Sequence, residues 1–219
     1  MFNVLPPPVD ISALDAKRVA PFGGWDVYQD TFYSTLVVPQ AGQPIGQPLV
    51  FFAGNEAGGL ADRSLTNVAA PNALIPGGHK FWAQRLFFVP LIETFVAGAG
   101  VLDASGLSRD VDRVFKTNRP TFSYTSTKLN KSRGQIPLDS VGELGGIMPD
   151  FGGTSAPAAG NNAVYQHARL APLGGWPIDL VVYENEGLTV SVVWGALTAL
   201  QAAMTLRCVV MGWHYVQVG

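Results

Sequence analysis

The C-terminal stretch from Leu170 to Gly219 constrains the fold more strongly than any other part of the chain. It contains three runs rich in Val, Leu, Trp and Tyr, namely Pro177 to Tyr183, Leu188 to Trp194 and Leu206 to Val216. Such residues fit a pleated, largely buried surface, and in the first run the apolar residues recur at every second position. The Asn and Gly of residues 184–187 form turns readily. The stretch therefore predicts three successive β-strands, the last of which closes a sheet.

The same signal recurs earlier, and little of the chain favours helix. Further strands are predicted at Phe32 to Val38, Leu49 to Ala53, Lys80 to Ile92, Thr121 to Lys128 and Ala163 to Ala171. The 25 glycines and 16 prolines are interspersed, which is typical of many turns between short strands. Only Ser108 to Lys116 has the cap and the apolar face of a helix. At 219 residues the chain predicts one all-β sandwich domain with one short helix and long Gly/Pro-rich loops.

Two segments of the sequence lack the regular spacing of apolar residues that is typical of strands and helices. Residues 1–30 include Pro6-Pro7-Pro8, which favours an extended polyproline arm, so the β domain is predicted to span 31–219. This arm either reaches a neighbouring subunit or crosses the surface of its own domain, and the sequence leaves both alternatives open. The second segment, Leu129 to Asn162, is a glycine-rich loop whose length is typical of a functional loop or of one held by a partner.

Charge and hydropathy exclude several classes of function. Charged residues make up 14% of the chain and hydrophobic residues 47%, so we expect another chain to cover part of the surface. The net charge of -2 and the lack of a basic run argue against direct nucleic-acid binding. The first ten residues do not resemble a signal peptide. The uncharged run from Gly187 to Leu206 is interrupted by polar residues and is predicted as strand, loop and strand rather than as a membrane span.

No residue pattern predicts a catalytic centre, a cofactor site or a metal site. His79, His167 and His214 are far apart in sequence, and no zinc, nucleophile-elbow or phosphate-loop motif is present. The pair Glu184 and Glu186 is expected in a solvated turn without a cleft, or in a polar subunit contact, rather than in a glycosidase. Asp110 and Asp112 lack the rest of a calcium loop. Cys208 is expected in the core and has no intrachain disulfide partner.

Three stretches resemble the single-jelly-roll capsid proteins of tailless icosahedral bacteriophages, many of which have an internal membrane. The first is Pro177-Ile178-Asp179-Leu180 followed by Glu184-Asn185-Glu186. The second is the final strand, Val209-Val210-Met211-Gly212-Trp213-His214-Tyr215-Val216-Gln217. The third runs from Leu65-Thr66-Asn67-Val68 through Leu74-Ile75-Pro76-Gly77-Gly78 to Phe81, with Ala69-Ala70-Pro71-Asn72 in place of the family's usual polar run.

The resemblance implies an eight-stranded jelly roll that builds an icosahedral shell by repeated subunit contacts, in a virion made in the host cytoplasm. Implied partners are copies of the chain, a second capsid protein and, where one exists, an internal membrane or membrane protein. Neither an enzymatic activity nor a small-molecule substrate is expected. The alternative is a virion spike or lectin-like module that binds a receptor or carbohydrate. This alternative requires exposed aromatic residues and Asp/Asn clusters around one pocket, whereas the five tryptophans are spread along the chain.

Overall fold

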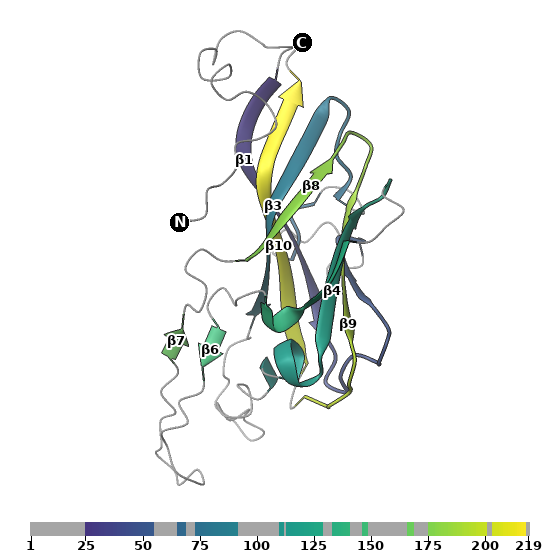
Figure 1. Ribbon diagram of the computed structural model, residues 1–219, viewed down its shortest axis with the longest axis vertical. Helices are drawn as coiled ribbons and strands as arrows, with labels where there is room; N and C mark the ends of the chain where they lie inside the picture. The colour runs from purple at the N-terminus through teal and green to yellow at the C-terminus, as the bar shows by residue number, and fades with distance from the viewer. Residues whose placement is uncertain are drawn as a thin grey trace.

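The computed structural model describes residues 25–54, 65–68, 73–91, 110–111, 113–128, 133–140, 146–148, 166–168, 175–200 and 203–217. Two four-stranded antiparallel sheets lie face to face (Figure 1). The first has the order β1-β10-β3-β8, made of β1 (Trp25–Val38), β10 (Met204–Gln217), β3 (His79–Leu91) and β8 (Trp176–Val182). The second has the order β2-β9-β4-β5, made of β2 (Leu49–Phe51), β9 (Leu188–Trp194), β4 (Pro120–Ser126) and β5 (Arg133–Pro137).

This strand order is that of a jelly roll. Among the eight strands of the sandwich, taken in chain order, every step crosses from one sheet to the other except that from β4 to β5. Such winding places strands from both ends of the chain side by side, so β10 lies between β1 and β3. The predicted all-β, eight-stranded jelly-roll sandwich is therefore confirmed.

The core fills the space between the sheets because side chains alternate along each strand. In β9, Leu188, Val190 and Val192 are fully buried, while the residues between them face outward and are partly exposed. Phe88 of β3 lies between Phe51 and Phe122 of the opposite sheet, with edge-to-face ring centroids 5.7 and 5.5 Å away. Burying one such side chain contributes roughly 1.5–3 kcal/mol, so the aromatic contacts stabilise the packing of the sheets.

A bulge in β3 explains why its buried face changes phase. Phe81 and Ala83 face the core, and then Leu86 and Phe88 do so, because the register with β8 shifts between Ala83 and Arg85. Gly212 lies opposite this bulge on β10. A Cβ at that position would collide with the main chain of Trp82, so the close approach of the two strands requires glycine.

Most predicted strands are confirmed, and the end of β3 shows how Pro90 fits. β8, β9, β10, β4 and β3 match their predicted ranges to within about two residues. Pro90 pairs with Leu206 of β10, but β8 pairs with β3 only as far as Leu86. β3 is therefore a central strand in its first half, and Pro90 lies where the missing N–H costs no hydrogen bond to β8. Residues 187–206 form the end of β9, a loop and the start of β10, as predicted.

Two predicted boundaries were wrong. The segment Trp25 to Asp30, assigned to the arm, belongs to β1 and pairs with residues 212–217 of β10; residues 1–24 lie outside the described part. The predicted loop 129–162 contains β5, the short 3-10 turn η4 (Leu138–Ser140) and β6 (Gly146–Met148). β6 pairs with β7 (Gln166–Ala168), the described part of the strand predicted at 163–171.

The predicted helix is present in a different form. Asp110 and Val111 are helical, but residues 113–117 form a π-helix, η3 (Arg113–Thr117), instead of an α-helix. Its predicted apolar face is confirmed, since Val111, Val114 and Phe115 are buried. Trp194 of β9 donates a hydrogen bond from Nε1 to the carbonyl of Val114 at 3.0 Å, which fixes η3 to the second sheet.

Candidate functional site

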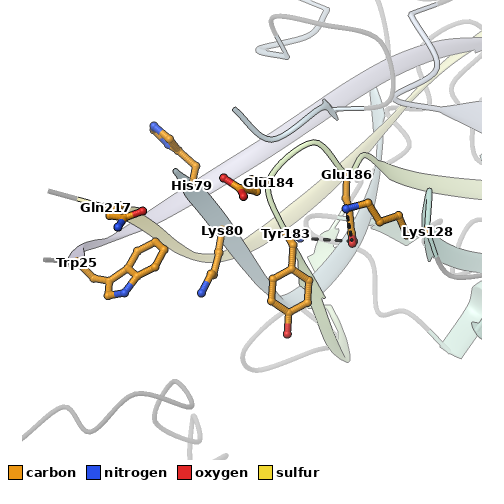
Figure 2. Close-up of a pocket in the computed structure, with 8 residues that line it drawn as sticks. All are labelled: Trp25, His79, Lys80, Lys128, Tyr183, Glu184, Glu186 and Gln217. Carbon is orange, nitrogen blue, oxygen red and sulfur yellow. Dashed lines mark hydrogen bonds and ion pairs between the residues drawn. The ribbon is translucent and has the colours of Figure 1, made fainter. Parts of the chain in front are cut away.

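A pocket of ≈ 370 Å³ lies at one end of the sandwich, where β1 begins and β10 ends (Figure 2). We refer to it as the end pocket. The strands β1, β3 and β10, the residues just after β4 and the turn between β8 and β9 all contribute to it, through Trp25, His79, Lys80, Lys128, Tyr183, Glu184, Glu186 and Gln217. Residues from five separate parts of the chain meet there because the jelly roll brings these strand ends together.

Two aromatic rings hold the ammonium group of Lys80 at this pocket. The Nζ atom lies 4.2 Å from the ring centroid of Trp25 and 5.8 Å from that of Tyr183. Figure 2 shows the three side chains projecting to the same side, while His79 projects to the other. A cation over an aromatic face contributes about 0.5–1 kcal/mol at an exposed site. Lys80 of β3 therefore links Trp25, the first residue of β1, to Tyr183, which directly follows β8.

The turn after β8 brings both glutamates to the pocket. Asn185 has a φ of 58°, a left-handed conformation that Asn tolerates, and this reverses the chain into β9. Glu184 Oε2 accepts a hydrogen bond from the Gly78 amide at 2.7 Å, and the buried Glu186 forms an ion pair with Lys128 at 3.5 Å. The prediction of a turn is confirmed, but the expectation that these carboxylates lack a cleft was wrong.

A second cluster borders the end pocket and joins three strands of the first sheet. His214 of β10 lies between Asp30 of β1 and His79 of β3. Its Nδ1 is 2.8 Å from Asp30 Oδ2, and its Nε2 is 3.0 Å from His79 Nδ1. We call these three residues the Asp-His-His chain. His214 is only 6% exposed and contacts the rings of Phe32 and Phe81, each with a centroid 6.2 Å away.

The electrostatics of this chain follow from its hydrogen bonds. The bond from His214 lowers the pKa of the Asp30 carboxyl, assisted by the Thr31 amide at 2.8 Å and opposed by partial burial. Tyr28 stacks on the His214 ring at 5.2 Å. Burial, followed by the charges of Asp30 and Asp26, raises the pKa of the Tyr28 hydroxyl. Asp30 is therefore a carboxylate over the whole physiological range, and its charge faces His214.

The Asp-His-His chain was not predicted from the sequence. The three histidines are far apart in sequence, but the sheet brings His79 and His214 into contact, whereas His167 is in β7 opposite Ile147. No local sequence motif predicts the contact between His79 and His214, which depends on the register of the strands. Within the described ranges, no group of three or more His, Cys, Asp or Glu side chains could hold a metal ion.

The remaining residues singled out in the sequence have structural surroundings. Asp110 is buried and forms an ion pair with Arg113 at 3.1 Å, while Asp112 lies outside the described residues. Cys208 is fully buried as predicted, and burial raises the pKa of its thiol well above the usual value. A thiol in this state is a poor nucleophile, so Cys208 acts as a small core residue.

The opposite end of the sandwich exposes several large apolar side chains. The β1–β2 loop and the β9–β10 loop are joined there by hydrogen bonds from Gly46 N to Trp194 O at 3.2 Å and from Leu200 N to Gln40 O at 2.8 Å. Three large side chains at this end are exposed to solvent, Val37 by 43%, Ile45 by 61% and Leu197 by 51%. We call these three residues the apolar tip. Isolated apolar residues are common on surfaces, so the apolar tip is at this point a candidate contact surface.

Fold and site together define the class as a jelly-roll sandwich with a polar pocket at one end and an apolar tip at the other. Comparisons with protein-family models, with curated proteins and with solved structures find no match. In the part of the chain that the structure describes, no helix has the length and apolar character needed to cross a membrane.

Proposed function

We propose that this protein is a structural subunit of an icosahedral viral capsid, which assembles with copies of itself and with a second capsid protein. The observation that carries the proposal is the strand order β1-β10-β3-β8 over β2-β9-β4-β5, an arrangement found in many capsid subunits. The resemblance of the last three strands to single-jelly-roll phage capsid proteins supports the same function. Fold alone does not fix function, so surface properties must also agree.

The surface of the chain favours contacts with other subunits. Charged residues are only 14% of the sequence, and the apolar tip exposes Val37 near the end of β1 together with Ile45 and Leu197 on two hydrogen-bonded loops. Repeated symmetric contacts let many weak interfaces add up to a stable shell. The apolar tip is the described surface that we assign to such a contact between copies of the chain.

Assembly can be tested with purified and co-expressed protein. Sedimentation and electron microscopy should show concentration-dependent oligomers and, with the partner capsid protein, shells or hexagonal arrays. The variant Ile45→Asp places a charge on the apolar tip and should raise the concentration needed for assembly about tenfold, a loss of about 1.4 kcal/mol per contact. Leu74→Asp, at a 46% exposed position before β3, is the matched control and should leave assembly unchanged. A strictly monomeric wild-type protein at high concentration would contradict the proposal.

A second candidate function is a receptor- or carbohydrate-binding module of a virion. The observation that favours it is the end pocket, where Trp25 and Tyr183 lie near Glu184 and Gln217. Aromatic faces with adjacent polar groups are common in sugar-binding sites. Against it, the Lys80 ammonium already occupies the face of Trp25. Screening immobilised glycans with the wild type and with Tyr183→Ala distinguishes the two functions, since only a binding module loses a glycan signal in that variant.

A further inference from the structure

The Asp-His-His chain has a defined arrangement of protons. The Asp30 carboxylate can only accept a hydrogen bond, so His214 must donate to it from Nδ1. When His214 is neutral, its Nε2 carries no proton and accepts from His79 Nδ1. Both contacts are therefore satisfied with two neutral imidazoles, and the Nε2 atom of His79 is left without a proton.

One added proton leaves both contacts in place. If His214 takes it, Nδ1 still donates to Asp30 and Nε2 now donates to the lone pair of His79 Nδ1, whose own proton moves to Nε2. The positive charge lies 2.8 Å from the Asp30 carboxylate, which stabilises it. A second proton removes the last acceptor. The N–H groups of His214 Nε2 and His79 Nδ1 then face each other without an acceptor between them, and the two positively charged imidazoles repel each other.

We propose that the Asp-His-His chain is a proton-linked latch, which holds the ends of β1, β10 and β3 together while its two imidazoles carry at most one proton and releases β3 when both are protonated. This inference does not depend on the proposed capsid function. It assigns to His79 and His214 a role in controlling how the end pocket is closed.

The surroundings decide which contact breaks. Asp30 and the stacked Tyr28 face His214 from β1, with Phe81 from β3 against the same ring. His79 shares the end pocket with Lys80, with Glu184 from the turn after β8, and with the Lys128–Glu186 ion pair. Because Asp30 is bonded to His214, the doubly protonated chain keeps the β1–β10 contact. The repulsion between the two protonated imidazoles therefore breaks the contact between His214 and His79.

Opening of this contact has a local backbone reporter. The amide of Gln217 donates to the carbonyl of Gly78 at 2.8 Å, and Gly78 directly precedes His79. When His79 moves away from β10, this hydrogen bond loses its support. Amides in the middle of β10, such as that of Val210, lie between paired β1 and β3 and are not affected.

Hydrogen exchange followed by NMR on the full chain tests the latch. Between pH 8 and 5, where histidines change charge, the protection factor of the Gln217 amide should fall at least about tenfold, while that of Val210 should not change. In His79→Gln, the side-chain amide still donates to His214 but cannot take up a proton, so the fall should disappear. A constant protection factor in the wild type, or the same fall in His79→Gln, overturns the proposal.

Imidazole ¹⁵N spectra of the wild type give a second readout that needs no variant. A coupled pair takes up its protons in two separate macroscopic steps. The latch predicts that the protection factor of Gln217 follows the second step and not the first. Independent titration of the two histidines, or loss of protection with the first proton, would contradict it.

Discussion

At the residue scale, single positions fix where the first sheet bends and how its strands are held together. Gly212 lets β10 approach the bulge in β3 closely, and the Asp-His-His chain joins β1, β10 and β3 near their ends. Neither feature has a local sequence signature. Both arise because β10 pairs with β1 and with β3 along most of its length.

We expect Gly212→Ala to destabilise the protein by about 1–3 kcal/mol or more, the usual cost of overpacking a closely packed site. The added methyl group would collide with the Trp82 carbonyl, and both strands would have to separate to make room. Gly77→Ala is the control, since a Cβ there meets nothing within 4 Å. Urea unfolding of both variants measures the difference, and equal stability of the two would refute this account of the bulge.

Asp30→Asn should show a pH-dependent loss of stability. The pKa of Asp30 is lowered in the folded protein, mainly by its hydrogen bond to His214. Its stabilising contribution is therefore fully present above the unfolded-state pKa of about 3.9 and is lost as the pH falls through the folded-state pKa. We expect the variant to be less stable by about 1 kcal/mol at neutral pH, since Asp30 is partly exposed, and equal to the wild type at strongly acidic pH. Denaturant titrations at several pH values measure the difference in unfolding free energy between the variant and the wild type. A difference that persists in strong acid would contradict this reasoning.

At the element scale, the strands that sequence reasoning predicts are those with a buried face. β4, β8 and β9 alternate between buried and exposed residues, and this alternation is visible in their letters. β5 was missed because its residues are exposed except for the half-buried Ile136, so it has no alternation to detect. The start of β1 was missed because none of residues 25–30 is buried. The Asp-His-His chain could not be predicted, because His79 and Asp30 are separated from His214 by 135 and 184 residues and only the strand register joins them.

Removal of residues 213–219 should prevent folding. The end of β10 pairs on one side with Trp25 to Gln29 and on the other with His79 to Trp82, so its loss leaves two strands without a partner in the middle of the sheet. We expect no cooperative thermal transition by circular dichroism. Removal of residues 218 and 219 alone, which follow β10, is the control and should leave the melting temperature nearly unchanged. A soluble 1–212 fragment that melts cooperatively would show that the sheet closes without this segment.

At the scale of the whole molecule, the two ends of the sandwich differ in chemistry. The end pocket gathers charged and aromatic side chains, whereas the apolar tip exposes Val37, Ile45 and Leu197. Antiparallel strands run between the two ends, and in Figure 1 the C-terminal end of β10 marks the end with the pocket. The two proposals therefore assign contacts with copies of the chain to one end and a response to pH to the other.

Two N-terminal deletions separate folding from assembly. Every strand pairing of the two large sheets lies within residues 25–217, so removal of residues 1–24 should preserve the cooperative unfolding transition. If the arm reaches a neighbouring subunit, the same deletion should impair assembly. Removal of residues 1–30 also deletes the first six residues of β1, including Asp30, the hydrogen-bond acceptor of His214. This longer deletion should lower the stability of the fold by several kcal/mol, because it exposes the edge of β10 and leaves His214 buried without its acceptor. Thermal melting combined with electron microscopy distinguishes the two effects. Normal assembly by the shorter deletion would place the arm on its own domain. Equal stability of the two deletion variants would show that the first six residues of β1 do not stabilise the sheet.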